Sequence, residues 1–381
     1  MKKNSLIFTI CLALSCIFIS CKEDQIETVN KDQSKILEQY VNHTIAPTYT
    51  NLASQTEQLV ADLQEFRTSR TQGNLNHVCE TFLTARAWWE KSEAFLFGAA
   101  SDFGIDPHID SWPLDVNAFN TMMSNAAQIQ AMDAEDGDVY AGERLGNSLL
   151  GFHGIEYILF RNGSPKSADE ITDLELIYAI AVAGDLRNRC FQLEVSWIGS
   201  RAPKSHRDKV EELELNTMVN SGNYNYGENL MKSGSLGSTY ASTVSGLMAI
   251  VDGCKTIADE VGTSKIGKPY NGEDPNYIES PYSQKSIEDF YNNIVSIENA
   301  YLGGIDGEQS PTQSLHAYIG SLDKNLDNRV MNAIAYAKNK IQAMPAPFVS
   351  NYTNPANAEA ITACQTLDEV LSEVNNLLSK Q

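Results

Sequence analysis

Basic residues are scarce in this 381-residue chain. It carries 28 Lys and Arg against 49 Asp and Glu, which gives a formal net charge of −21. A surface this acidic repels phosphate backbones and anionic lipid headgroups, so we expect no nucleic-acid partner. The excess of carboxylates suits either the capture of cations or simple solubility.

Cysteine is also sparse, and its spacing excludes a zinc knuckle. Three of the seven cysteines lie within the first 21 residues. The other four are far apart and form no C-x-x-C pair, which a zinc knuckle would need: Cys79, Cys190, Cys254 and Cys364. One or two disulfides are compatible with this spacing, and so are buried free thiols.

The usual hydrolase motifs are absent. Helical zinc peptidases carry His-Glu-x-x-His or its inverse, and many serine hydrolases carry Gly-x-Ser-x-Gly. Neither pattern occurs here, and the chain has only six histidines, at positions 43, 77, 108, 153, 206 and 316. A metallopeptidase is therefore the least favoured of the functions considered below.

Strand-like alternation is lacking, whereas apolar residues recur at helical spacing along most of the chain. The expected fold is all-α, with two antiparallel helical-bundle domains and a site near their interface. The domains would cover residues 32–165 and 166–381, joined at the turn signals of residues 162–165. We predict helices over residues 32–66, 75–97, 118–132, 142–161, 169–198, 240–261, 286–302, 314–344 and 359–378, with an interruption at Pro47, and loops over residues 102–115 and 262–282.

The first 20 residues resemble a bacterial lipoprotein signal peptide. Lys2 and Lys3 precede an apolar run that ends at Ser20 and Cys21, as in such signals. We therefore expect lipid on Cys21, a tether over residues 21–31, and attachment to the outer membrane of the cell envelope on its periplasmic or surface face. An ordinary secretory signal peptide is the alternative. Beyond this segment no run reaches the roughly 18 to 20 apolar residues of a membrane span.

The strongest functional signal is the segment Gly-Phe-His-Gly-Ile-Glu at residues 151–156. His153 and Glu156 are three residues apart in a helical pattern, so their Cβ atoms should lie roughly 5–6 Å apart on one face. Such a pair can share one cation, or one side chain can orient the other. Gly151 and Gly154 each cost a helix about 1 kcal/mol relative to Ala, so we expect them to allow another backbone to approach. A structural His–Glu pair without a ligand is the alternative.

The helix predicted over residues 75–97 contributes further candidates. Arg86 and Glu90 are four residues apart, which is typical of an ion pair on a solvated face. Glu93 differs because apolar residues surround it in the sequence. A carboxylate is rarely buried without a partner, so Glu93 is expected to face the site.

The loop that follows pairs two carboxylates with a large aromatic ring. Asp110, Trp112 and Asp115 lie within six residues of one another, and loop residues held between helices are frequent site residues. The alternative for Asp115 is a helix cap, because Asp favours helix N-termini.

Three segments together resemble the imelysin-like family: Gly151-x-His153-x-x-Glu156, the Ile109-Asp110-x-Trp112-Pro113 loop, and the preceding helix with Arg86 and Glu93. The stretch at residues 286–303 is similar to that family's second bundle. The resemblance implies an all-helical protein of two bundle-like domains, an envelope location and a link to iron uptake. Some relatives are described as peptidases, but the missing motifs argue against carrying this activity over.

These observations predict a metal site. His153 and Glu156 form its fixed pair, with Glu93 and one of Asp110 or Asp115 completing the shell. The neighbouring residues would be Arg86, Trp112, Gly151 and Gly154. One imidazole among carboxylates suits iron, but also zinc or another divalent metal.

The expected function is that of an envelope-anchored lipoprotein that binds iron or an iron complex for uptake. Its partners would be the metal ion or iron chelate, the membrane through the lipid, and envelope transport proteins. If Arg86 points into the cavity, an anionic chelate becomes the preferred ligand. The alternatives are a non-enzymatic interaction module and a metallopeptidase.

Overall fold

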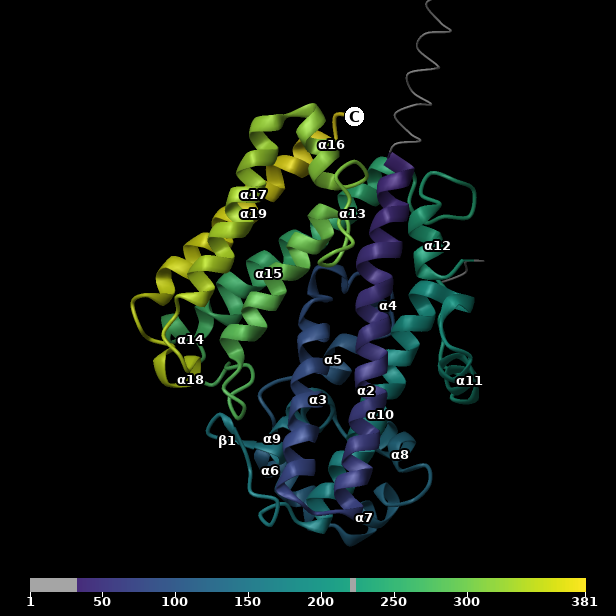
Figure 1. Ribbon diagram of the computed structural model, residues 1–381, viewed down its shortest axis with the longest axis vertical. Coiled ribbons are helices and arrows are strands. Elements are labelled where there is room, and N and C mark those ends of the chain that lie inside the picture. The colour runs from purple at the N-terminus through teal and green to yellow at the C-terminus, as the bar shows by residue number, and fades with distance from the viewer. Residues whose placement is uncertain (1–32, 220–223) are drawn as a thin grey trace, which may run out of the picture.

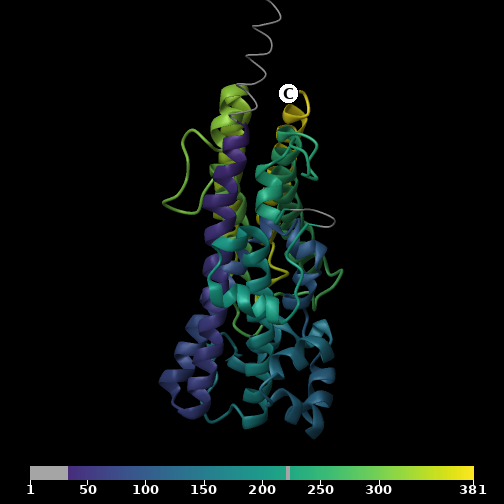
Figure 2. The same cartoon turned by 90° about the vertical axis from the view of Figure 1, so that its right-hand side faces the viewer.

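A computed structural model describes residues 33–219 and 224–381, which form an elongated and almost entirely helical molecule (Figures 1 and 2). Within these residues the only sheet is a hairpin of two short antiparallel strands, β1 (Phe160–Arg161) and β2 (Ser164–Pro165). The all-α fold class is thus confirmed. Among the described residues, none of the helices has the length and hydrophobicity that a membrane span requires. The predicted signal peptide, tether and Cys21 lie outside the described residues.

Three long helices dominate the first half of the chain: α2 (Ala46–Thr68), α3 (Gln72–Glu90) and α10 (Asp173–Ile198). Helix α2 packs against both of the others. Helical residues 33–40 lead into α2 through a π-helical segment, Val41–Ile45. Pro47 lies in the first turn of α2, where its missing N–H costs little. The interruption predicted at Pro47 is therefore a local change of helical pitch just before it.

The chain between α3 and α10 is divided into short elements, some of them shorter than predicted. Asn125 makes one of the breaks, because its side chain caps the N-terminus of α7. Gly151 makes another, because its φ is positive, at 67°. The predicted helices 118–132 and 142–161 are each divided, and residues 102–115 include a helical turn. The elements are a 3-10 turn (Glu93–Phe95), α4 (Ala99–Asp102), α5 (Ile105–Ile109), α6 (Val116–Met123), α7 (Ala126–Met132), α8 (Gly137–Arg144), a second 3-10 turn (Asn147–Leu149) and α9 (Gly151–Leu159).

The second half of the chain begins with a 3-10 turn and two short helices and continues as an antiparallel array (Figure 1). Asp323 accepts hydrogen bonds from the backbone N–H groups of Asn325 and Leu326. This cap starts a new helix and splits the predicted helix 314–344. The elements are a 3-10 turn (Gly199–Arg201), α11 (Lys204–Glu212), α12 (Tyr226–Met231), α13 (Thr243–Asp259), a π-helical segment (Glu260–Lys265), α14 (Gly267–Asn271), α15 (Ser286–Leu302), α16 (Leu315–Leu322), α17 (Lys324–Gln342), α18 (Phe348–Asn351) and α19 (Asn357–Leu378).

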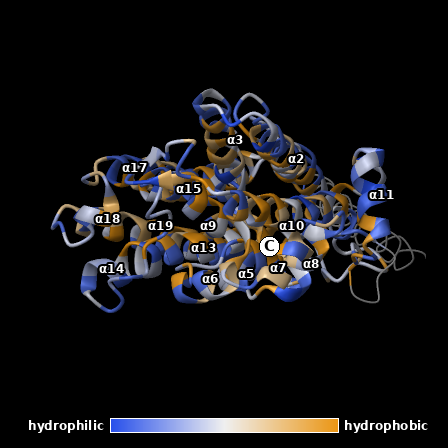
Figure 3. Cartoon of the chain, turned by 90° about the horizontal axis from the view of Figure 1, so that it is seen from below, coloured by the Kyte–Doolittle hydropathy of each residue, from blue (hydrophilic) through white to orange (hydrophobic). Residues whose placement is uncertain are grey.

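The two halves meet along α15, which packs beside α3, and along α13, which packs beside the 3-10 turn Glu93–Phe95. The buried apolar residues form one cluster that spans both halves. Figure 3 shows hydrophobic residues between the central helices and a hydrophilic α11 at the periphery. Helix α10 follows the predicted boundary at residue 165 but packs against α2. The division into two domains stays a prediction.

Candidate metal centre

A buried cluster of polar side chains lies where α3, α5 and α9 meet α15 and the segment 265–285 that precedes it. Each of its members is exposed by 7% or less. They comprise two permanent cations, one imidazole, one amide and six carboxyls: Arg86, Lys265, His153, Asn293, Glu90, Glu93, Asp110, Glu156, Glu279 and Asp289. Charged side chains are almost never fully buried unless they are paired, so this cluster needs a physical account.

Arg86 is the hub of the cluster. One guanidinium nitrogen contacts Asp110, and another lies 2.5 Å from Glu90 Oε1 and 2.6 Å from Glu279 Oε1. Burial alone would lower the pKa of Arg86, but the surrounding carboxylates raise it well above its ordinary value. The predicted solvated face at Glu90 is wrong. The i,i+4 ion pair with Arg86 exists, but α15 covers it, and Asn293 Nδ2 of that helix donates to Glu90 Oε2 at 2.5 Å.

Asp110 is held on both of its oxygens. Its Oδ2 accepts a 2.7 Å hydrogen bond from Trp89 Nε1, and its Oδ1 faces Arg86 and His153. Burial alone would raise the pKa of Asp110, but Arg86 and then His153 lower it below its usual range. Asp110 is therefore an ionised carboxylate at neutral pH.

His153 lies between two carboxylates. Its Nδ1 is 3.4 Å from Glu156 Oε2, and its Nε2 is 3.0 Å from Asp110 Oδ1. The contact between Nε2 and Asp110 is short enough for a hydrogen bond but does not have the angles of one. Nε2 therefore has no hydrogen-bond partner among the described residues. Burial alone would lower the pKa of His153, but Asp110 and Glu156 raise it to about 9. The imidazole is thus poised to hold a positive charge, either a proton or a metal ion.

Glu156 lies behind the imidazole. Its Oε1 accepts hydrogen bonds from the backbone N–H groups of Tyr282 and Ser283, at 3.1 and 2.7 Å. Both of its oxygens are therefore engaged, one with the loop before α15 and one with His153. The His–Glu pair was predicted either to share a cation or to have one side chain orient the other. The geometry favours the second role for Glu156. A carboxylate that bonds one ring nitrogen of a histidine fixes the orientation and the tautomer of the ring.

Lys265 is the partner of Glu93. Its Nζ lies 3.8 Å from Glu93 Oε1, 3.7 Å from Glu90 Oε2 and 3.2 Å from Glu279 Oε1. Burial raises the pKa of Glu93 well above its ordinary value, against the opposing effect of Lys265. Glu93 does face the cluster, but it lies beside an ammonium group rather than beside His153.

Two groups of three side chains in the described part of the chain could hold a metal ion, with ligand atoms within 4.8 Å of one another: Asp110, His153 and Glu279, and separately Glu90, Glu93 and Asp110. In the second group, Glu90 and Glu93 both face Lys265, which already supplies a positive charge. In the first group, His153 Nε2 and Glu279 Oε2 are buried and have no hydrogen-bond partner among the described residues. Asp110 and Glu279 also contact Arg86, and Glu279 lies 3.2 Å from Lys265. The imidazole of His153 therefore distinguishes the first group as the better candidate for a metal ion.

The two glycines of the motif allow close packing. A Cβ on Gly151 would lie 1.8 Å from the carbonyl oxygen of Ile109, so its absence lets the chain before Asp110 lie against α9. A Cβ on Gly154 would lie 2.2 Å from the hydroxyl oxygen of Tyr178. That hydroxyl donates a 2.6 Å hydrogen bond to Leu149 O, just before α9. The expected close approach of another backbone is therefore found at Gly151, whereas at Gly154 the group that comes close is the side chain of Tyr178.

Asp115 does not reach the cluster. It is exposed and caps α6, accepting a 2.9 Å hydrogen bond from the backbone N–H of Ala118. Of the two loop carboxylates considered, the structure brings only Asp110 to His153. The capping role satisfies a backbone donor that the helix itself leaves unpaired.

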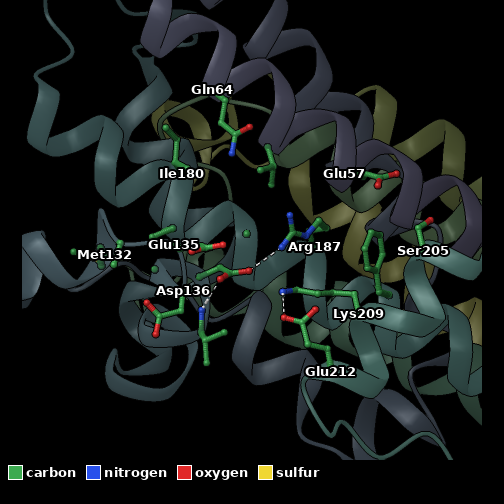
Figure 4. A pocket seen from close by; sticks show the side chains of 18 residues that line it. Glu57, Gln64, Met132, Glu135, Asp136, Ile180, Arg187, Ser205, Lys209 and Glu212 are labelled. Atoms are coloured by element: carbon green, nitrogen blue, oxygen red, sulfur yellow. Dashed lines mark hydrogen bonds and ion pairs between the residues drawn. The ribbon is translucent and has the colours of Figure 1, made fainter.

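A pocket of 360 Å³ reaches His153 from the surface. Trp112 forms part of its wall, with its ring 5.7 Å from the ring of His153. A larger cavity of 780 Å³ lies elsewhere, between α2, α8, α10 and α11 (Figure 4). Its lining cations are already paired, since Arg187 lies 2.8 Å from Asp138 and Lys209 lies 3.2 Å from Glu212. Two other pockets also reach the cluster: one of 210 Å³ is lined by Glu93 and Asp110, and one of 640 Å³ by Glu93. The pocket of 360 Å³ is the one of these that His153 lines.

Four members of the cluster come from the second half of the chain and were not predicted as site residues: Lys265, Glu279, Asp289 and Asn293. Lys265, Glu279 and Asp289 lie in or beside the segment predicted as a long loop, residues 262–282. For Lys265 and Glu279 the only signal was the length of that loop, because long loops in compact domains are often functional. Asp289 belongs to the stretch 286–303, which resembles the family's second bundle, but it was not predicted as a site residue. Nothing in the sequence pairs them with residues almost two hundred positions earlier.

Comparisons with known proteins agree with this architecture. The chain is 26% identical over 377 residues to iron-regulated protein A of Synechococcus elongatus, which covers 97% of this chain and 90% of the relative. A solved structure of a protein described as an iron-regulated protein A precursor, from Parabacteroides distasonis, superposes with a TM-score of 0.77 at 26% identity, covering 92% of this chain and 95% of the other.

A second solved structure shares the fold alone. This imelysin-like protein from Psychrobacter arcticum has a TM-score of 0.57 at 14% identity and covers 92% of this chain and 94% of its own. The model of the family described as imelysin matches residues 45–374. Because that match spans most of the chain, this protein belongs to the imelysin family.

Proposed function

We propose that this protein binds iron at the cluster around His153 and serves iron uptake in the bacterial envelope. One observation carries the proposal. The ligand atoms of Asp110, His153 and Glu279 lie within 4.8 Å of one another in a buried site, and two of these residues present an atom with no hydrogen-bond partner among the described residues. Buried polar atoms usually have partners, so the convergence of one imidazole and two carboxyls in a buried site supports a ligand there.

The charge balance of the cluster supports a cation. Its six carboxyls face two permanent cations, Arg86 and Lys265, and the imidazole of His153, whose pKa is raised to about 9. Unpaired buried carboxylates must take up protons or a counter-ion. Burial raises the pKa of Glu279 to about 7, against the opposing effect of Lys265. A metal ion at Asp110, His153 and Glu279 would replace such protons and balance the charge.

The choice of iron rests on the donors and on the relatives. One imidazole and two carboxylates suit iron, manganese or zinc without selecting sharply between them. The relative from Synechococcus elongatus is named an iron-regulated protein, which favours iron among the three. In this proposal Glu156 orients the imidazole, while Arg86 keeps Asp110 ionised.

The envelope location rests on residues 1–31. We propose that Cys21 carries lipid and that the folded part faces the periplasm or the cell surface. Loss of membrane association in Cys21→Ser, measured by fractionation of cells that express the full chain, is the expected result. Unchanged membrane association would contradict the lipid anchor and leave the metal site unaffected.

The metal site is tested by metal content. Protein comprising residues 22–381 is exposed to Fe, Mn or Zn, desalted and measured by mass spectrometry, as wild type, His153→Ala and Glu279→Gln. His316→Ala is a matched control, because His316 Nδ1 also pairs with a carboxylate, 2.7 Å from Asp327 Oδ1, but outside the cluster. We expect one equivalent of iron in the wild type and the control, and none in the two site variants.

The opposite outcome is equally informative. No metal in the wild type under any condition, together with a lower melting temperature in His153→Ala, would identify the cluster as a structural element of an interaction module.

A further inference from the structure

The pocket in front of His153 has an apolar and aromatic wall. Among the described residues that line it there is no Asp, Glu, Lys or Arg. Pro275 and Asn276 are exposed and mark its mouth, whereas buried His153 marks its inner end. The wall between them is formed mainly by aromatic, proline and aliphatic side chains: Trp112, Pro113, Ile278, Tyr282, Val349 and Tyr352.

Such a wall does not serve a bare metal ion. A bare ion is stabilised by charged or polar groups. Next to an apolar surface it loses bound water without gaining such groups, which is unfavourable. The wall instead matches a ligand with an apolar body and a polar head. Most small-molecule sites have this composition, with a few polar groups that fix the orientation of the ligand.

The inner end of the pocket offers what an oxygen-donor chelate needs. Three protein ligands would leave coordination positions open for other donors, and His153 lies at the boundary between the pocket and the cluster. The indole N–H of Trp112 is buried without an acceptor among the described residues. A chelator oxygen is an acceptor of the kind that an indole N–H requires.

We infer that the pocket binds a compact ferric chelate whose chelator is a single aromatic ring with two oxygen donors, of the catechol class. This inference rests on the proposed function, because it takes Asp110, His153 and Glu279 as ligands of the same metal ion. The volume of 360 Å³ lies at the lower end of the range of small-molecule pockets, about 300–1,000 Å³. It therefore suits one ring rather than a large macrocycle.

Charge selects among such chelates. The six carboxyls of the cluster outnumber Arg86, Lys265 and His153 together, so the cluster favours a complex with a net positive charge. A ferric ion with one catecholate dianion carries a single positive charge, whereas complexes with two or three catecholates are anionic. The expected ligand is the one-to-one complex, with the ring against Trp112, Tyr282 and Tyr352 and the metal at His153.

The test distinguishes the contribution of the aromatic ring to binding from the contribution of the metal ion. The probes are one-to-one ferric catechol and one-to-one ferric oxalate, which has the same charge and two oxygen donors but no ring. Binding to protein of residues 22–381 is followed by the visible charge-transfer band of ferric catecholate and by quenching of tryptophan fluorescence for both probes. Free iron is measured in parallel by metal content.

The variants are Tyr352→Ala, which removes a ring from the wall, and Val349→Asp, which places a carboxylate there. Tyr336→Ala is the matched control, because Tyr336 is a partly exposed ring on α17 that does not line the pocket. We expect the wild type and the control to bind ferric catechol about tenfold more tightly than ferric oxalate, as aromatic packing allows. Both pocket variants should lose this preference and still bind free iron.

Equal affinity of the wild type for the two complexes would overturn the inference, and so would an unchanged preference in both pocket variants. These outcomes differ from failure of the proposed function. A wild type that binds free iron without any preference for the ring contradicts only this inference. A wild type that binds neither free iron nor either complex contradicts both.

Discussion

Replacement of Arg86 by Leu should destabilise the protein strongly. Arg86 is 2% exposed and lies against the carboxylates of Asp110, Glu90 and Glu279. Leu fills much of the same space but carries no charge, so these carboxylates lose their main counter-ion. Removal of one partner from a buried ion pair typically costs about 3–5 kcal/mol. We expect a loss of that size in the free energy of unfolding of the metal-free protein at about pH 8.

The loss should shrink as the pH falls. Burial already raises the pKa of Glu279 to about 7 in the wild type, and loss of Arg86 should raise it further. A carboxyl whose folded pKa exceeds its unfolded value binds more protons in the folded state, so stability falls as pH rises through that interval. Below it the carboxyl is neutral and no longer needs a cation. The difference between Arg86→Leu and the wild type should therefore be smaller at about pH 5.5 than at pH 8.

Urea unfolding followed by far-UV circular dichroism at both pH values measures these differences. Arg329→Leu is the control, because Arg329 is exposed and pairs with Glu373 at the surface, with 2.8 Å between Nη1 and Oε2. Its unfolding midpoint should match that of the wild type. A deficit below about 1 kcal/mol for Arg86→Leu, the level of an ordinary surface substitution, would refute the reasoning. So would a deficit of the same size at both pH values.

Two further predictions concern packing. Burial raises the pKa of three thiols, Cys79, Cys254 and Cys364, to about 12, and all four cysteines in the described residues are free and buried. Folded protein of residues 22–381 should not react with a thiol reagent at pH 8, whereas denatured protein should show four thiols; fewer than four would indicate a disulfide. Gly151→Ala should cost more stability than Gly104→Ala in thermal unfolding. Both glycines have positive φ, which costs an L-residue about 1–2 kcal/mol, but only at Gly151 would the new Cβ clash, with Ile109 O. Equal losses would contradict this account.

The helical content could be read from local patterns, and the errors are local as well. The predicted helix 286–302 matches α15, because apolar spacing and the closing Gly303 agree. The predicted helix 314–344 is two helices, because the Asp323 side chain satisfies backbone donors and begins a new helix. Apolar periodicity continues across such a cap, so periodicity alone does not reveal the break.

The candidate site was only half visible in the sequence. His153, Glu156, Arg86 and Asp110 stand out because helical spacing and loop composition are local properties. Glu90 was predicted to be solvated, because its own helix gives no sign that α15 covers it.

The sequence by itself therefore determined the helices, the shared face of His153 and Glu156, and the acidic character of the chain. Only the tertiary structure decided that the loop before α15 holds one oxygen of Glu156 while the other faces His153, and that Glu279 lies near the imidazole. The physical reason is that a helix fixes neighbours three or four residues apart, whereas Arg86 and Glu279 meet only through the packing of α3 against α15 and the segment before it. That packing depends on the apolar surfaces of both halves together, and it is what brings carboxylates from both halves close to Arg86 and Lys265.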